Sequence, residues 1–220
     1  IMEKRRLGQA NKPVMVVPNH LLEQAVREFR LLYPDAKILA TDSHGLSGDG
    51  RKKFVAQAAG GDWDAVIMTA TSFKSIPLSE SSIADKMQAE LDELRAKRDE
   101  ELDKGKGETA AVKKYAAQIL AKEADLKEIQ DRLARDRGGL DFESIGFDYL
   151  VVDEAHGYKN DEVESDIPGL AKVNANMAAI DLREKLDWLR GDAEARGRTS
   201  VAMFATGTPG CFGFPAGVEP

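Results

Sequence analysis

The chain has 220 residues, a formal net charge of −7 and 42% hydrophobic residues. This length can bury one sizeable core, and the acidic balance argues against a protein that coats nucleic acid with a basic surface. A single cysteine, Cys211, excludes an internal disulfide framework and favours a reducing, cytoplasmic environment, and no apolar run is long enough to predict a membrane partner.

Five short runs rich in valine, isoleucine and leucine predict β-strands. Each run is almost continuously apolar, which is typical of strands that are covered on both faces in a parallel sheet. Apolar residues at helical spacing lie in residues 21–32 and 180–189. Strands that alternate with helices predict an α/β fold with a parallel sheet and right-handed crossovers. The five runs are residues 14–17, 37–40, 65–69, 149–152 and 200–205.

One segment, residues 80–136, departs from this alternation because 27 of its 57 residues are charged, against 42 of the other 163. Apolar residues recur in it at helical and seven-residue spacing on either side of Gly105 and Gly107. This pattern predicts two long helices folded into an antiparallel hairpin with a narrow coiled-coil seam. A solvated spacer and a specific partner-binding arm both fit such a charged surface. The apolar positions are Met87, Leu91, Leu94, Val112, Tyr115, Ile119, Leu126, Ile129 and Leu133.

The run at 149–152 ends in Asp153 and Glu154, with His156 two residues further on. In open parallel sheets, ligands bind beyond the carboxyl ends of the strands, so this strand brings two carboxylates to the edge where a ligand would lie. Mg²⁺ prefers one or two carboxylates together with waters and phosphate oxygens. The stretch therefore fits a Walker B element, in which Asp153 holds Mg²⁺ through water and Glu154 polarises the attacking water.

A second predicted strand, in VAMFATGTPG, ends in the turn Thr-Gly-Thr-Pro at 206–209. Together with Asp-Glu-Ala-His at 153–156, it resembles motifs II and III of the superfamily-2 helicases and translocases, particularly the Swi/Snf-type branch. VMVVPNHLLEQ at 14–24 resembles motif Ia, DAVIMTATSF at 64–73 resembles motif Ib, and the Lys-Asn pair at 159–160 also agrees with that branch. The long helical segment resembles that of phage- and plasmid-borne helicases that often accompany an adenine-specific DNA methylase.

The resemblance implies the fold of a first RecA-like lobe and the cofactors ATP and Mg²⁺. It implies that Asp153 and Glu154 serve Mg²⁺ and water. His156 would sense the γ-phosphate of ATP and contact motif III.

Two further roles follow from the resemblance. Thr206, Gly207 and Thr208 would couple the nucleotide state to movement of the lobes. Residues along a nucleic-acid track would offer backbone N–H and hydroxyl groups to phosphates. Helix capping is the alternative role for the asparagine of motif Ia and the threonines of motif Ib. The track residues are Pro18, Asn19, Thr69 and Thr71.

The 220 residues contain no G-x-x-x-x-G-K-[ST] sequence, the phosphate-binding Walker A loop. In the resembling family this loop precedes motif Ia, so we expect residues 1–9 to be the tail of the helix that follows it. The expected function is the first motor lobe of an ATP-dependent DNA helicase or translocase, inactive without that loop and a second lobe. Expected partners are DNA, in duplex form, the second lobe and an associated DNA methylase.

The expected lobe comprises residues 1–79 and 137–209, with the helical hairpin at 80–136 inserted between them and an irregular tail at 210–220. Two other interpretations stay open. One is the lobe of an RNA helicase, which would share the chemistry of motif II. The other is a non-catalytic fragment that assembles with partners through the helical hairpin, and nucleotide hydrolysis would separate it from an enzyme.

Overall fold

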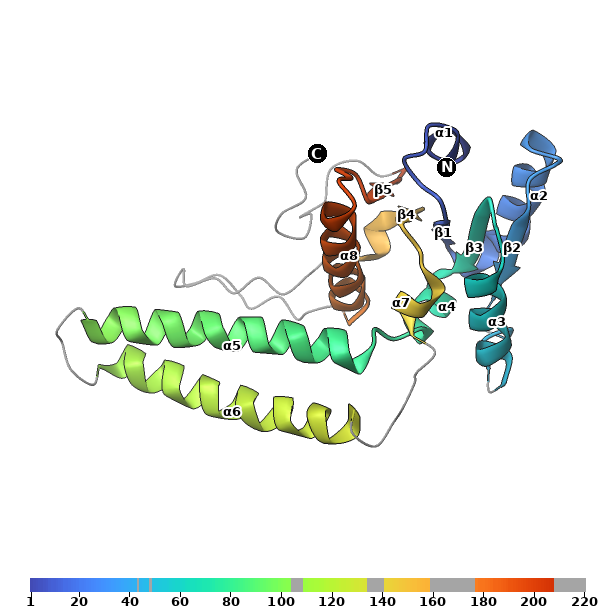
Figure 1. Cartoon of the computed structure of the whole chain (residues 1–220). Helices are drawn as coiled ribbons and strands as arrows, with labels where there is room; N and C mark the ends of the chain where they lie inside the picture. Colours follow the sequence, from blue (N-terminus) through green and yellow to red (C-terminus); the bar gives the residue numbers. More distant parts are fainter. Residues whose placement is uncertain (43, 48, 104–108, 134–140, 159–176, 208–220) are drawn as a thin grey trace. The chain divides into compact units, whose positions relative to one another are not determined.

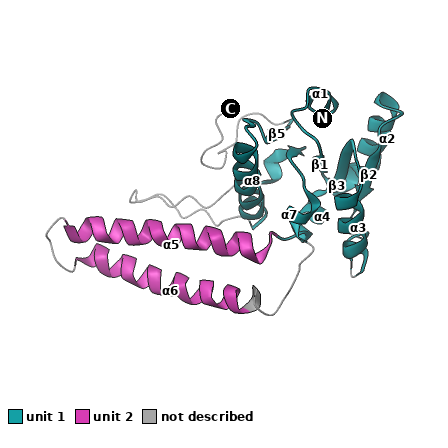
Figure 2. Cartoon of the chain, in the orientation of Figure 1, with its two compact units in different colours: residues 1–77, 140–220 teal, residues 78–139 magenta. Residues whose placement is uncertain are grey.

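The computed structural model describes residues 1–42, 44–47, 49–103, 109–133, 141–158 and 177–207. The chain divides into two compact units (Figure 2). Unit 1 comprises Ile1–Pro77 and Leu140–Pro220, and unit 2 comprises Leu78–Gly139. Among the described residues, no helix has both the length and the apolar content that a membrane span requires.

Unit 1 contains a five-stranded, entirely parallel sheet with the strand order β2-β3-β1-β4-β5 (Figure 1). This confirms the predicted α/β fold with a parallel sheet, as a RecA-like lobe would have. Residues 208 and 209 of the predicted Thr-Gly-Thr-Pro turn lie outside the described residues. The strands are β1 (Pro13–Val17), β2 (Ile38–Thr41), β3 (Ala65–Thr69), β4 (Tyr149–Val152) and β5 (Ala202–Phe204).

The core of unit 1 is centred on β1, β3 and β4. All residues of β3 and β4 are buried, as the continuous apolar runs predict. The register places Val14 of β1 beside Val66 of β3 and Leu150 of β4, and all three side chains are 0% exposed. Each such side chain contributes about 1.5–3 kcal/mol when it is fully buried, so these rows hold the three strands together.

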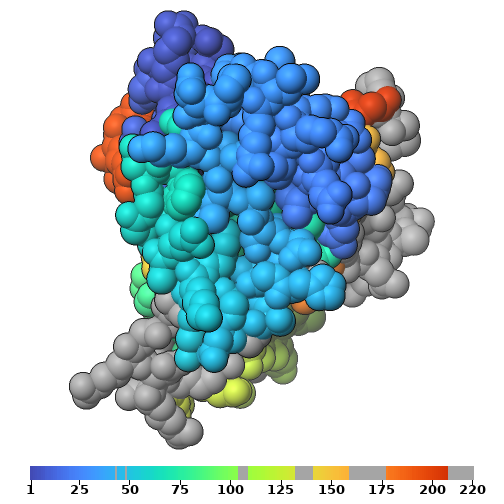
Figure 3. All heavy atoms as spheres, turned by 90° about the vertical axis from the view of Figure 1, so that its right-hand side faces the viewer, coloured from blue at the N-terminus to red at the C-terminus, as the bar shows by residue number. Residues whose placement is uncertain are grey.

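Helices connect and cover the strands of unit 1. Residues of α2, β2 and α3 make up most of the surface that faces the viewer in Figure 3. The longest helix of this unit, α8, buries residues spaced three and four apart, which places them on one face. The helices are α1 (Met2–Arg6), α2 (Leu22–Leu32), α3 (Asp49–Gly60), α4 (Ala70–Ser75), α7 (Phe142–Ile145) and α8 (Met177–Ala195), with 3₁₀ turns η1 (Asn19–Leu21) and η2 (Ala155–Tyr158).

Two short helices of unit 1 depend on their caps, because they are too short to be stable by themselves. Thr69 accepts a hydrogen bond from the N–H of Ser72 at the start of α4. Asp141 accepts one from the N–H of Ser144 at the start of α7. Gly146 ends α7 at φ 76°, a left-handed conformation that favours glycine.

Buried charge holds the amino-terminal edge of the sheet. The Asp148 carboxylate, 5% exposed, accepts hydrogen bonds from the backbone N–H groups of Asn11 and Lys12 at 2.7 and 2.8 Å and pairs with Arg198. The Lys12 ammonium donates to the last carbonyls of α3 and to the carbonyl that ends α7. These bonds fix the start of β1 beside the start of β4.

Unit 2 consists of α5 (Glu80–Asp103) and α6 (Ala110–Leu133), which pack side by side in antiparallel directions (Figure 2). Leu91, Ile119 and Leu126 form a buried stripe between the helices. Ion pairs join the helices at their surface, including Arg95 Nη2 to Glu123 Oε1 at 2.6 Å. The stripe explains why so charged a segment can be helical, since few apolar residues suffice for a two-helix seam.

Candidate functional site

The carboxyl ends of β1, β3, β4 and β5 lie along one edge of the sheet, because all strands are parallel. Asp153 directly follows β4, and its N–H donates to the carbonyl of Val16 in β1 at 2.8 Å. The N–H of Ala155 donates to the carbonyl of Ala205 at 2.9 Å. Backbone bonds therefore tie the segment after β4 to β1 and to the residues just before Thr206.

Glu154 has an unusual backbone conformation, with φ at 50° in the left-handed region. For a residue other than glycine this costs about 1–3 kcal/mol, and such strain is concentrated at functional sites. Its N–H donates to Asp153 Oδ1 at 3.0 Å, and its Oε2 lies 2.9 Å from Nδ1 of His156. The three predicted catalytic side chains are therefore held as one group at the strand end.

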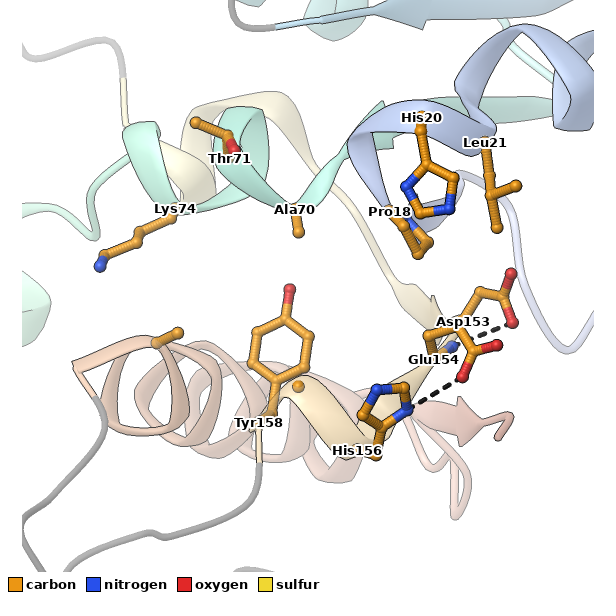
Figure 4. Close-up of a pocket in the computed structure, with 12 residues that line it drawn as sticks. Pro18, His20, Leu21, Ala70, Thr71, Lys74, Asp153, Glu154, His156 and Tyr158 are labelled. Carbon is orange, nitrogen blue, oxygen red and sulfur yellow. Dashed lines mark hydrogen bonds and ion pairs between the residues drawn. The ribbon is translucent and has the colours of Figure 1, made fainter. Parts of the chain in front are cut away.

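These side chains open into a cavity of about 640 Å³ (Figure 4). One wall comes from the ends of β1 and β3 and the helices that follow them, and the other from the end of β4, from η2 and from α8. Lys74 and Asp153 lie at opposite ends of the cavity in Figure 4. The first wall is formed by Pro18, His20, Leu21, Ala70, Thr71 and Lys74, and the second by Asp153, Glu154, His156, Gly157, Tyr158 and Ala178.

Asn19 and Thr71, which are 52 residues apart, meet at the first wall. The Asn19 side-chain amide donates to Thr71 Oγ1 at 2.9 Å, and the Thr71 hydroxyl donates to Asn19 Oδ1 at 3.1 Å. Both side chains are exposed. The structure thus joins the stretches that resemble motifs Ia and Ib through their polar side chains.

Thr69 is placed differently from the other residues of the expected nucleic-acid track. It is 2% exposed, and its hydroxyl is used by the backbone N–H of Ser72 at 3.2 Å and by the Ser72 hydroxyl at 2.8 Å. For Thr69 the structure favours the capping alternative, because a buried and bonded hydroxyl cannot reach a ligand at the surface. Its position orients the helix that carries Thr71.

A protein-family model described as a probable helicase domain matches residues 1–211. The chain belongs to this family. Membership indicates a helicase-related function and a helicase-like enzyme. The match includes residues of both compact units and all residues of the cavity. No curated protein and no solved structure matches the chain.

Sequence reasoning did not identify all the residues that line the cavity of this helicase domain. Lys74 lies three residues after Thr71 on α4, which places both on one face of this helix, but a helix of six residues is too short to show a period in the sequence. Tyr158 directs its hydroxyl towards the α4 side of the cavity (Figure 4). Burial and the nearby Asp181 carboxylate raise the pKa of Tyr158 to about 12, so the phenol is neutral at ordinary pH.

The donor set at the end of β4 fits Mg²⁺. The described residues contain no group of three or more histidine, cysteine or acidic side chains around one point. Mg²⁺ does not need such a cage, because waters and phosphate oxygens complete its six positions beside one or two carboxylates. Asp153 and Glu154 supply those carboxylates. Thr206 and Gly207 follow β5 nearby, whereas Lys159, Asn160 and Thr208 lie outside the described residues.

Proposed function

We propose that this helicase domain is the first motor lobe of an ATP-dependent DNA helicase or translocase. The observation that carries the proposal is the cavity at the carboxyl edge of the sheet. One of its walls presents two carboxylates and an imidazole, and the other presents Pro18, Thr71 and a lysine. Ligands of open parallel sheets bind at this edge.

We assign the chemistry of hydrolysis to the end of β4. Bound ATP would supply the phosphoryl group, and bound Mg²⁺ would supply the positive charge that neutralises it as the bond breaks. Glu154 accepts a proton from the attacking water, and its contact with Nδ1 of His156 holds the carboxylate in place. Asp153 uses Oδ1 for the N–H of Glu154, and no described residue donates to its Oδ2, which suits a metal-bound water.

We assign the nucleic-acid contacts to the opposite wall. The side chains of Asn19 and Thr71 and the turn at Pro18 offer amide and hydroxyl groups to a phosphate backbone. Lys74 adds a cation, which strengthens such contacts at low salt. Thr69 acts through the α4 cap and makes no direct contact. The choice of duplex DNA over RNA rests on the resemblance to the Swi/Snf-type branch.

The segment after β5 would couple the two walls to movement of the motor. The bond between Ala155 N–H and the Ala205 carbonyl links the carboxylate end of β4 to Thr206 and Gly207. A change in the position of Glu154 would therefore reach this segment directly. The 220 residues contain no Walker A loop, so we assign hydrolysis to the motor protein in which this lobe is joined to such a loop and to a second lobe.

Nucleic-acid binding by the 220-residue chain tests the proposal. Fluorescence anisotropy would be measured with duplex DNA, single-stranded DNA and duplex RNA at low ionic strength. Thr71→Val keeps the shape of the side chain but removes the hydroxyl, and we expect it to weaken DNA binding by about 2–10-fold, the value of one lost hydrogen bond.

Thr199→Val is the matched control, because Thr199 is exposed just before the amino-terminal end of β5. We expect this variant to bind as the unaltered chain does. Equal affinities of the chain and Thr71→Val would contradict the assignment of this wall. A preference for duplex RNA would favour an RNA helicase instead.

A further inference from the structure

Helix α8 contains a lysine that is completely buried. Lys185 is 0% exposed, and its ammonium donates to the backbone carbonyl of Phe73 at 2.8 Å and to Asp181 Oδ2 at 2.8 Å. The ammonium also lies 4.3 Å from the ring centroid of Phe73 and 5.7 Å from that of Phe142. Two hydrogen-bond acceptors and two aromatic rings therefore lie around this cation.

Burying this ammonium is costly, although the side chain of its partner Asp181 is 24% exposed. Burial lowers the pKa of Lys185 and raises that of Asp181, and each charge opposes the change in its partner. Replacing a buried ion pair by apolar residues of similar volume is often neutral or stabilising, by about 1–4 kcal/mol in measured cases. Stability alone therefore does not explain a lysine here, whereas its directional bonds would fix the orientation of the groups that it joins.

The pair lies on α8, which contacts an element of each wall of the cavity, α4 and η2. Lys185 binds the Phe73 carbonyl in the last turn of α4, where a cation also suits the helix dipole. Thr71 and Lys74 of the first wall lie on this same short helix. Asp181 lies on α8, which packs against η2, the turn that contains His156 and Tyr158 of the second wall. Its charge adds to the effect of burial on the pKa of Tyr158.

We propose that the Lys185–Asp181 pair is a positioning element that links the nucleic-acid wall on α4 to the carboxylate wall at η2. This inference rests on the proposed function. Neither residue touches the reacting groups. A shift of α4 moves the Phe73 carbonyl, and Lys185 must follow because a buried ammonium without a partner is costly. Asp181 follows Lys185 on α8, and the packing of α8 against η2 then carries the change to His156, which contacts Glu154.

Amide chemical shifts of the 220-residue chain, recorded while a short DNA duplex is added, would test the link. In the unaltered chain, we expect the duplex to shift the amide signals of Asn19 and Thr71 and also those of residues 154–158. In Lys185→Met, which is similar in length but uncharged, the first group should still shift. The DNA-induced change in the amide chemical shifts of residues 154–158 should be about fivefold smaller, which is the lower end of the usual coupling between two sites.

Lys12→Met is the matched control. Lys12 also binds carbonyls at helix ends in unit 1, but those helices, α3 and α7, do not line the cavity. A merely structural role for Lys185 predicts that both variants lower stability and leave the response of residues 154–158 intact. The proposal predicts loss of the response in Lys185→Met and its retention in Lys12→Met.

The remaining outcomes are also decisive. If DNA shifts neither Asn19 nor Thr71, the proposed function fails and the link fails with it. If those signals shift but residues 154–158 respond in Lys185→Met as strongly as in the unaltered chain, the link alone is overturned. The link alone is also overturned if Lys12→Met weakens their response as much as Lys185→Met does. Should Lys185→Met not fold, Asp181→Asn keeps the bond to Phe73 and tests the same loss of response. Failure of both variants to fold would make the pair a general structural element and overturn the proposal.

Discussion

Unit 1 and unit 2 both bury apolar residues, but they place their charged side chains differently. Unit 1 buries Lys185 and Asp148, each with directed partners. Unit 2 keeps its ion pairs at the surface, as in the pair between Arg95 and Glu123, whose side chains are 41% and 43% exposed. Exposed pairs contribute little to stability and weaken with salt. The described residues of unit 1 thus include buried charges with directed partners, whereas unit 2 depends on its apolar stripe.

Truncation of core side chains should show whether the two units are energetically separate. Ile67 in β3 is 0% exposed and Leu91 in α5 is 1% exposed. Ile67→Ala should lower the free energy of unfolding of unit 1 by about 2–5 kcal/mol, since it removes buried methyl groups and leaves a cavity. Leu91→Ala should destabilise unit 2 and leave unit 1 as it was. Hydrogen exchange, resolved by residue, measures both.

The control for this comparison is Leu120→Ala, because Leu120 in α6 is 70% exposed. We expect a change within about 0.5 kcal/mol, as for most surface substitutions. If either core truncation lowers the protection from hydrogen exchange equally in both units, the two units unfold as one cooperative body.

The buried carboxylate at the amino-terminal edge gives the next largest expected effect. Asp148→Asn keeps the shape of the side chain but loses the charge that accepts from two backbone N–H groups and from Arg198. We expect the free energy of unfolding to fall by about 2–3 kcal/mol, as for hydrogen bonds to a charged group. Denaturant titration would measure it. Asp125→Asn on the exposed surface of α6 is the matched control, and an equal loss there would contradict the contrast between the units.

Removal of the helical pair should have the smallest effect. The N–H of Phe142 donates to the carbonyl of Pro77 at 2.9 Å, so the two ends of unit 1 that flank unit 2 already lie together. Replacing residues 80–136 by a short Gly/Ser linker should change the stability of unit 1 by only about 1 kcal/mol, because loop entropy varies slowly with length. Loss of cooperative unfolding in the shortened chain would show that unit 2 belongs to the core.

Much of the sheet could be predicted from the sequence. The runs at 65–69 and 149–152 became β3 and β4 with unchanged bounds, because a strand buried on both faces must be continuously apolar. The strand order could not be predicted, since it depends on which strands pair and not on composition. Helices α4 and α7 were not predicted, because six and four residues are too few to show a period.

The convergence of the candidate residues could be predicted where they follow the ends of strands. The ends of β1, β3 and β4 converge on one cavity, so Pro18, Thr71 and Asp153 lie on its two walls as the parallel sheet required. The pair of α8, a buried lysine with a partly buried aspartate, was not foreseen. Asp181 and Lys185 are four residues apart, and in a sequence this spacing is typical of an exposed helical pair. Only packing against α4 reveals that the lysine is buried.

Phosphate release from the proposed motor protein, measured with and without duplex DNA, tests the central claim most directly. The claim is that Glu154 activates water. In Glu154→Gln we expect DNA-dependent release to fall by about 10²–10⁴-fold, the usual contribution of a general base, while ATP still binds. Glu93→Gln, on the exposed surface of α5, should leave release unchanged. The 220-residue chain alone should release phosphate only at background. Undiminished turnover in Glu154→Gln, or DNA-dependent release by the 220-residue chain alone, would contradict the account.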